Sequence, residues 1–419
     1  MATSVAASAL RSRIEEISFN IKRQHEILRD LESQQSAAQS QLNSILDPME
    51  RLPLELSSEI FMQCFPDKPS FEPSEAPALF TQVSRCWTRI ALSTPALWAS
   101  VCDADITPYS GFYRPGEGFD ELFHRWISRS KSLPLTVNLG RSLRAGRQST
   151  SVVQQYAHRV QELSLSLQSD PGFQRTEAAY PSLKTLTLTS RESKFLNAEG
   201  CVKILRSAPN LINCSLFNFS YEDHTETWPL VTLSSLKCLT LGDASHPRHD
   251  DTSTIVQFLT LPSLETLRMS LAGVSRAWFI SFLTRSSPPL RSLSLSSMHY
   301  EEGEIEECLR LVADLTDLNI RFEGNPAESL LQLFAYAKGL LPHLCSLTIR
   351  AGSAEQSDYS TVADLLESRR GALRNFRLET EDVDLETNGP LADELRKALL
   401  SHRQAGMEVH VGTEEENLF

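Results

Sequence analysis

The sequence lacks the patterns that most often reveal a metal site, a redox centre or a hydrolytic active site. None of its eight cysteines is spaced as CxxC, so a zinc knuckle or a dithiol motif has no ligands to use. HExxH, GxSxG and phosphate-binding glycine loops are also missing. We therefore expect no enzyme activity, no catalytic residues, no metal and no cofactor. We expect the cysteines to be buried, reduced thiols.

Long hydrophobic runs and an excess of positive charge are also missing. No stretch approaches the ~18 uninterrupted apolar residues of a membrane helix. Arg11 and Arg13 interrupt the N-terminal region where a signal peptide would be apolar. The 40 Lys and Arg against 53 Asp and Glu give a formal net charge of −13, which repels phosphate backbones. We expect no membrane and no nucleic-acid partner, and we expect the protein in the cytoplasm, the nucleus or both.

Residues 10–46 keep a seven-residue period with no Pro or Gly before Pro48. The period predicts one long helix with two apolar seams. One seam is Ile14, Ile21, Leu28, Gln35 and Leu42, and the other is Ile17, Gln24, Leu31, Ala38 and Ile45. The seams need a cover, which leaves two alternatives. The helix self-associates as a coiled coil, or it lies on the rest of its own chain.

Residues 48–101 read as a small helical unit with large apolar side chains. A Pro-rich loop, Pro66 to Pro77, separates its two helical stretches. The spacing places two groups on helical faces: Leu56, Ile60 and Phe61, then Val83, Trp87 and Ile90. About 50 residues are too few for a strong core, so we expect a partner to cover apolar surface here.

The same stretch carries a family resemblance. LPLELSSEIF followed by QVSRCWTRIALSTPALW resembles the F-box motif, and is similar above all to the expanded F-box family of mushroom-forming fungi. Ser84 stands where that family more often carries Cys. The resemblance implies docking on the Skp-family adaptor of cullin–RING ubiquitin ligases. It assigns the apolar positions at or beneath that interface to Leu52, Pro53, Leu56, Ile60, Val83 and Trp87. The alternative is that these side chains only pack on the unit's own helices.

The rest of the chain is organised by leucine, which makes up 61 of the 419 residues. The element LxxLxL, with other apolar residues allowed, recurs nine times from Val160 to Leu378, at offsets of 23 to 29 residues. That period is typical of leucine-rich repeats, each with a strand, a loop and a helix. We predict an α/β chain in which residues 120–411 form a solenoid with a parallel sheet and outer helices. An acidic tail, 412–419, follows.

Strand alternation divides each LxxLxL element into two faces. The fourth and sixth residues are predicted to point into the core, and the third, fifth and seventh to line an open face. Four cations on that face are the candidate target-binding residues for an acidic or phosphorylated motif: Arg268, Arg321, Arg350 and Arg377. The alternative is internal pairing, of Arg350 with Glu379 and of Arg321 with Asp317.

The F-box resemblance, taken with the repeats, implies a substrate-receptor subunit of a Skp–cullin–F-box ubiquitin ligase. The F-box would bind the adaptor, and the repeats would bind an unidentified target protein. The alternative is an F-box and leucine-rich-repeat scaffold that works outside ubiquitination.

Overall fold

The computed structural model divides the chain into two compact units, Met1–Trp98 and Ala99–Phe419. We describe the units one at a time. The described residues are these: 2–103, 119–139, 153–167, 178–190, 198–218, 229–242, 251–271, 273–298, 302–322, 327–337, 339–354, 356–383 and 390–413.

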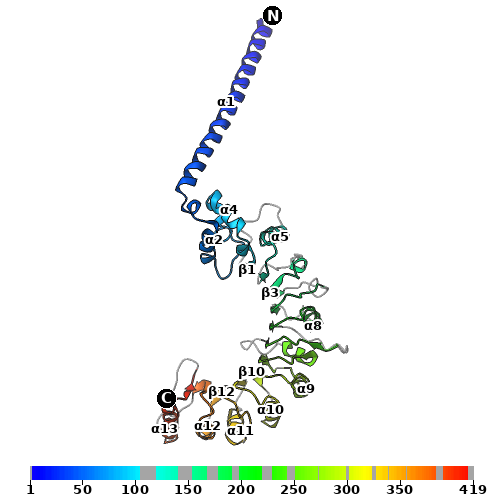
Figure 1. Ribbon diagram of the computed structural model, residues 1–419, viewed down its shortest axis with the longest axis vertical. Coiled ribbons are helices and arrows are strands. Elements are labelled where there is room, and N and C mark those ends of the chain that lie inside the picture. The colour runs from blue at the N-terminus through cyan, green and yellow to red at the C-terminus, as the bar shows by residue number, and fades with distance from the viewer. Residues whose placement is uncertain are drawn as a thin grey trace. The chain divides into compact units, whose positions relative to one another are not determined.

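The first unit begins with a single helix, α1, which spans Ala2–Leu46 (Figure 1). The helix predicted for 10–46 is therefore present and starts earlier. Its seam is uncovered, because the Ile and Leu side chains of both seams are 49% to 65% exposed. Within the described residues of the first unit these side chains have no cover, and both alternatives, self-association and docking on the rest of the chain, stay predictions.

Five short helical elements complete the first unit. They are η1 Pro48–Arg51, α2 Leu54–Gln63, α3 Phe80–Val83, α4 Arg85–Ser93 and η2 Pro95–Trp98. Three aromatic rings form the centre of their core. Phe61 stacks on Phe80 with centroids 4.2 Å apart and lies 5.0 Å from Trp87. Leu97 and Trp98 are fully buried as well.

The predicted helical faces of this unit need two corrections. Phe61 does not share a face with Leu56 and Ile60, because Phe61 is buried beside Ser57 while the other two are exposed. The one-residue step from Ile60 to Phe61 turns a helix by about 100°, which is enough to reach the core. The second predicted face is interrupted at Ser84, which is extended (φ −153°, ψ 168°) and separates α3 from α4.

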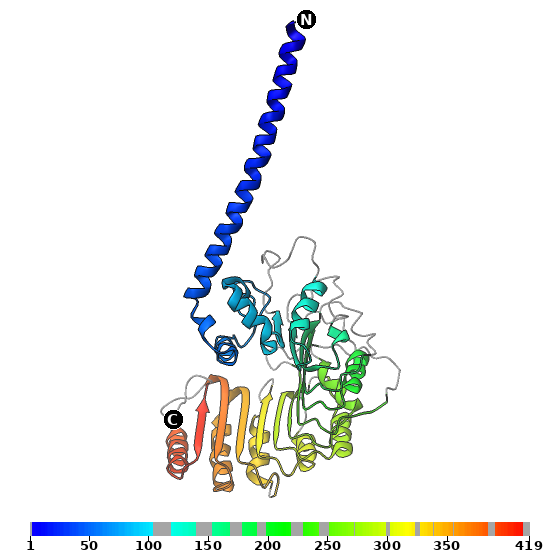
Figure 2. The ribbon, with the colours of Figure 1, turned by 45° about the horizontal axis from the view of Figure 1, so that its top comes forward.

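The second unit contains a parallel sheet of twelve strands (Figure 2). In chain order they are β1 Ser100–Asp103, β2 Leu135–Leu139, β3 Val160–Leu167, β4 Thr185–Ser190, β5 Asn213–Phe217, β7 Cys238–Leu241, β9 Thr266–Ser270, β10 Ser292–Met298, β11 Asp317–Phe322, β12 Ser346–Ala354, β13 Asn375–Val383 and β14 Glu408–Gly412. In this order each strand pairs with its neighbours on both sides, except β1 and β14, which are the two edges of the sheet. A separate two-stranded sheet pairs β6 Val231–Thr232 with β8 Leu259–Thr260.

Two predicted boundaries shift. The small helical unit was expected to reach residue 101, but Ser100–Asp103 is β1 and pairs with β2. The acidic tail was expected from residue 412, but Gly412 ends β14 and pairs with Glu379. The remainder of the predicted tail, 414–419, lies outside the described residues.

The nine LxxLxL elements coincide with the strands of the large sheet from β3 to β13, and each of these strands except β3 starts at the third residue of its element. Every first, fourth and sixth residue of the nine elements is buried, so the predicted core positions are confirmed. The second residues of consecutive elements are joined by backbone hydrogen bonds, each N–H donating to the carbonyl of the preceding element's second residue. Lys184 N donates to Gln161 O over 2.8 Å, and Ile212 N donates to Lys184 O over 2.8 Å.

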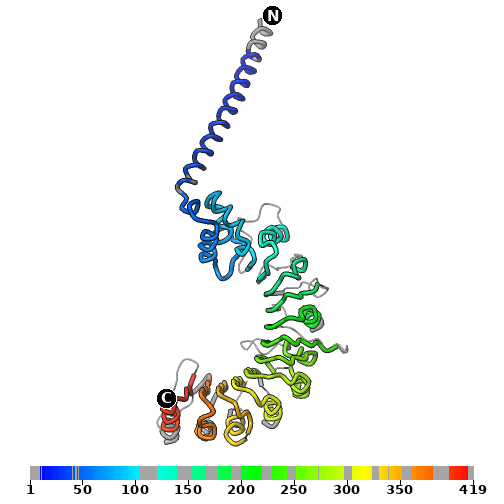
Figure 3. Tube along the Cα trace, viewed as in Figure 1, coloured from blue at the N-terminus to red at the C-terminus, as the bar shows by residue number. Residues whose placement is uncertain are grey.

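Helices follow most of the strands and lie on one face of the sheet (Figure 3). They are α5 Phe119–Arg129, α8 Ala198–Ser207, α9 Arg276–Ser286, α10 Glu302–Arg310, α11 Ala327–Tyr336, α12 Gln356–Ser368 and α13 Pro390–Gln404. One repeat departs from the expected strand, loop and helix, because η4 Asp251–Phe258 is a 3-10 helix that leads into β8. Three consecutive buried Thr and Ser residues, 252–254, explain this, since such residues favour turns over helices.

The cysteines fit the expected thiol role only in part. Five are buried, but Cys64 is exposed, and Cys238 and Cys345 are half-buried. Burial raises the pKa of the Cys214 thiol to about 12, which keeps it protonated and unreactive at neutral pH. Within the described ranges, no helix is both long and apolar enough to span a membrane.

Candidate functional site

The first candidate surface consists of the apolar residues that the F-box resemblance assigns to the adaptor. Leu56 and Ile60 lie one turn apart on α2 and are 54% and 42% exposed. Leu52 and Pro53, just before α2, are exposed too, and so is Val83 on α3. Five of the six assigned side chains are therefore available to a partner. The alternative, in which the group packs on the unit's own helices, does not hold for these five.

Trp87 is the exception, because its ring belongs to the aromatic core of the unit. The side chain is half-buried between Phe61 and Phe80. Its indole Nε1 donates to Asp47 Oδ1 over 3.2 Å. Trp87 is therefore a core residue of the unit that is also hydrogen-bonded to Asp47 at its start.

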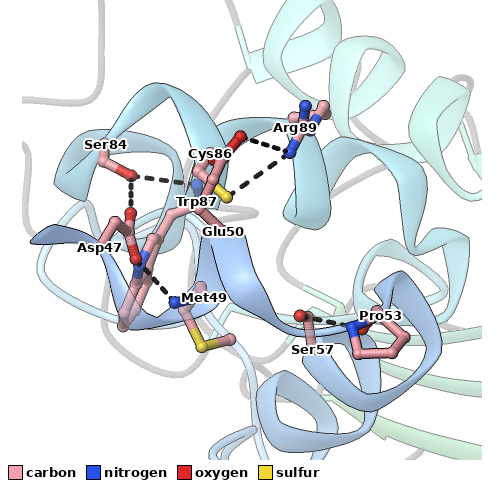
Figure 4. A network of polar contacts seen from close by, with 9 residues as sticks. All are labelled: Asp47, Met49, Glu50, Pro53, Ser57, Ser84, Cys86, Trp87 and Arg89. Atoms are coloured by element: carbon pink, nitrogen blue, oxygen red, sulfur yellow. Dashed lines mark hydrogen bonds and ion pairs between the residues drawn. The ribbon is translucent and has the colours of Figure 1, made fainter. Parts of the chain in front are cut away.

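Asp47 is the centre of a polar network that the sequence reading missed (Figure 4). Its Oδ1 also accepts from Met49 N over 2.9 Å, and its Oδ2 accepts from Ser84 Oγ over 2.7 Å. Burial raises the pKa of the Asp47 carboxyl, but the hydrogen bonds from Ser84, Met49 and Trp87 outweigh burial and hold the pKa below its usual range. The available signal was an Asp directly before Pro48, which is a helix-capping pattern.

Ser84 connects two of these elements through one hydroxyl. Its Oγ donates to Asp47 and accepts from Trp87 N over 3.2 Å, which caps the start of α4. A cysteine, the family's more common residue here, is a weaker donor and acceptor. Ser84 therefore has a local structural role in this chain.

The second candidate surface is the open face of the twelve-stranded sheet. Strand pairing aligns the open-face residues in rows, so that Arg268 lies beside Ser294, and Asn319 beside Thr348. Most of the row positions carry Ser, Thr or Asn. Within the described part of the second unit, the helices lie on the opposite side of the sheet (Figure 2). A partner would meet a shallow, polar, hydrogen-bonding surface.

The predicted arginine cluster is only partly as expected. Arg321 pairs directly with Arg350, and Arg377 is one diagonal step away beside Thr348, so three of the four candidate arginines lie on neighbouring strands. Glu379, expected as an open-face charge, is instead buried at 5% exposure. It forms ion pairs with Arg350 Nε and with Arg377 Nη1, the latter at 3.0 Å.

Because the Glu379 carboxylate is buried beside Arg350 and Arg377, these two arginines need less negative charge from a ligand. Burial raises the pKa of Glu379, but hydrogen bonds from Arg350 and Arg377 prevail and hold its pKa below its usual range. An ionised Glu379 thus offsets much of the repulsion between the two guanidiniums. The pairing expected as the alternative is present for Arg350. Arg268 is exposed two strands away from β11 and is separate from this cluster.

A metal site finds no support in the part of the chain that the structure describes. No group of three or more His, Cys, Asp or Glu residues there is placed to hold an ion. The His246 and His249 loop, the nearest approach to a metal pattern in the sequence, lies outside the described residues.

No protein-family model matches this chain, and no curated protein matches it either.

Proposed function

We propose that this chain is a substrate-receptor subunit of a Skp–cullin–F-box ubiquitin ligase. In this proposal residues 48–98 are the F-box and bind the Skp-family adaptor. The strands and helices from β2 to β14 are a leucine-rich-repeat solenoid, and its open face binds the target protein. The chain brings target and ligase together, and other subunits carry out the ubiquitin transfer.

The observation that carries the proposal is the exposure of Leu56, Ile60 and Val83 on a unit that has a complete aromatic core. Apolar side chains grouped on a small unit indicate an interface. The core does not need these residues, because Phe61, Phe80 and Trp87 already fill it. Their positions match the F-box pattern residue by residue, which supports the adaptor as the partner.

The regular sheet supports the second half of the proposal. Strands of near-constant spacing bury their leucines and leave a broad polar face, as repeat proteins that bind other proteins do. The target remains unidentified. Since Glu379 already pairs with Arg350 and Arg377, an anionic target motif would have to compete with a built-in carboxylate.

The test is co-purification of the full-length chain with a Skp-family adaptor. We expect Ile60→Lys to abolish the complex, because the interface would then bury an unpaired charge. Ile60 is exposed in the free chain, so the substitution should leave the fold intact. The matched control is Leu92→Lys on α4, where a side chain of the same 42% exposure lies outside the assigned set. Binding of both variants at the wild-type level would refute the adaptor assignment.

A scaffold that works outside ubiquitination would also bind the adaptor. The two functions differ in whether a cullin accompanies the adaptor in the purified complex. The receptor proposal requires the cullin, and its consistent absence would favour the scaffold.

A further inference from the structure

We propose that α1 binds α1 of a second copy of this chain as an antiparallel coiled coil, with Leu28 of each helix facing the partner's Leu31. This inference does not depend on the ubiquitin-ligase proposal. It specifies a partner, a direction and a register for the uncovered seam of α1.

The apolar side chains along α1 are exposed, so the helix needs a partner that covers them. The Ile and Leu side chains from Ile14 to Ile45 in the two seams are about half or more exposed, and the stripe runs along a helix of 45 residues. Monomeric soluble proteins rarely leave an apolar stripe of this length in water. A shallow groove on the helix is lined by Ile17, Asn20, Ile21, Gln24, His25 and Leu28, where the side chains of a second helix could insert.

The register follows from the two polar layers. In an antiparallel pair, each residue of one seam faces a residue of the other seam on the partner. One alignment fills all ten seam positions, and its facing pairs are Ile14–Ile45, Ile17–Leu42, Ile21–Ala38, Gln24–Gln35 and Leu28–Leu31, each occurring twice. In this alignment both Gln residues face each other and can exchange hydrogen bonds.

Neighbouring registers lose that match. A shift of one heptad in either direction places Gln24 opposite Leu28 or Leu42 of the partner. A buried amide without a hydrogen-bond partner is costly, and polar seam residues are known to select register in this way. The two Gln residues, which weaken the seam as an apolar stripe, therefore define one alignment.

A parallel pair also matches Gln with Gln, because every seam residue then faces its own copy. Two further features favour the antiparallel direction. Ala38 would face another Ala38 in a parallel pair and leave a gap, whereas it faces the larger Ile21 of the partner in the antiparallel one. The antiparallel pair also brings His25 beside the partner's Glu32, whereas in a parallel pair its flanking neighbour is the partner's Asn20.

The proposed pairing has a spatial consequence. With Leu28 opposite the partner's Leu31, the two copies of Asp47 lie at opposite ends of the paired helices. The rise of ~1.5 Å per residue separates them by about 50 Å along the axis. A parallel pair would bring them side by side instead. The dimer would thus carry the two copies of residues 48–98 at opposite ends of the paired helices.

The direction can be tested by disulfide trapping in the full-length chain. The exposed Cys64 is first replaced by Ser in all variants, and this background chain is the control for the remaining cysteines. Gln24→Cys with Gln35→Cys should then cross-link two chains on mild oxidation, while either substitution alone should not exceed the background. Efficient cross-linking of Gln24→Cys alone would overturn the antiparallel direction, since Cys at this position then faces its own copy.

Dimerisation itself is measured by light scattering on the full-length chain. We expect twice the chain mass of 46.9 kDa, and Leu28→Lys should reduce it to the monomer value. The matched control is Phe19→Lys, an equally drastic change at an exposed position away from both seams, which should leave the dimer intact. A wild-type monomer at micromolar concentration would overturn the proposal, as would equal effects of Leu28→Lys and Phe19→Lys.

Discussion

The two units of this chain differ in how far their apolar residues are buried. The second unit buries the first, fourth and sixth residue of every LxxLxL element and shows Ser, Thr and Asn on the open face of its sheet. The first unit leaves Leu56, Ile60 and Val83 exposed, together with the seam of α1. The leucines of the repeat elements are therefore core residues, whereas Leu56 and the leucines in the seams of α1 are exposed.

The contrast suggests different roles for the two groups of apolar residues: the buried ones stabilise the fold, and the exposed ones are available for binding. In a repeat unit, each strand is stabilised by its neighbours, so the apolar residues have partners within the chain. In the first unit, the aromatic core around Phe61 is complete without the exposed residues. Substitutions of exposed apolar residues there should impair binding and leave folding almost unchanged, while equivalent substitutions in the sheet should do the reverse.

The largest expected effect compares two leucines directly. Leu267→Ala, at a fully buried position of β9, should lower the free energy of unfolding of the second unit by about 2–5 kcal/mol. Leu56→Ala, at a 54% exposed position, should change the stability of the first unit by less than about 0.5 kcal/mol. Denaturant unfolding, with a separate transition fitted for each unit, measures both values. Similar losses for the two variants would contradict the contrast.

A smaller effect is expected for two arginines on α9. Arg285 donates to three backbone carbonyls, those of Val256, Gln257 and Leu259, at 2.6 to 2.9 Å. Arg285→Met should cost about 2 kcal/mol, because these acceptors lose a charged donor. Arg276 forms ion pairs with Glu304 and Glu307 of α10 at the surface, and Arg276→Met should leave the free energy of unfolding almost unchanged.

Urea unfolding of the second unit distinguishes the two arginine variants. If Arg276→Met were as damaging as Arg285→Met, surface ion pairs between repeats would matter more than the buried carbonyl contacts.

The smallest effect concerns pH and the first unit. Because the folded pKa of Asp47 lies below its ordinary value of 3.8, the carboxylate stabilises the fold at neutral pH. That contribution is lost as the pH falls below about 3.8 and through the folded pKa. Asp47→Asn should cost about 1 kcal/mol at pH 7 and remove this part of the acid dependence.

Unfolding free energies of wild type and variant between pH 7 and pH 3 test the role of Asp47. The control is Asp67→Asn, an exposed aspartate of the same unit, which should keep the wild-type pH profile. A constant difference between Asp47→Asn and wild type at every pH would contradict the proposed contribution.

The sheet was predictable from sequence because its signal is periodic. LxxLxL marks the buried positions of nine strands. The strands that escaped prediction, β1, β6 and β8, are short and carry no LxxLxL element. Outside the LxxLxL elements, the spacing of leucines does not predict where strands form.

The candidate sites were predictable only as positions along the chain. The sequence placed Arg350 and Arg377 on neighbouring strands, but side-chain burial decides whether Glu379 is a surface charge or their shared partner. The assignment of Phe61 to the face of Ile60 failed for a related reason, since one helical step separates core from solvent. The role of Asp47 depends on contacts with residues 37 and 40 positions away.

The most direct test of the account compares amide hydrogen exchange in the full-length chain alone and with a Skp-family adaptor. We expect new protection over residues 52–63, where the exposed apolar residues lie on and before α2, and we expect unchanged protection in strands β3 to β13. Protection that changes in the strands and not in α2, or in neither region at saturating adaptor, would contradict the claim that the first unit is built to be covered by a partner.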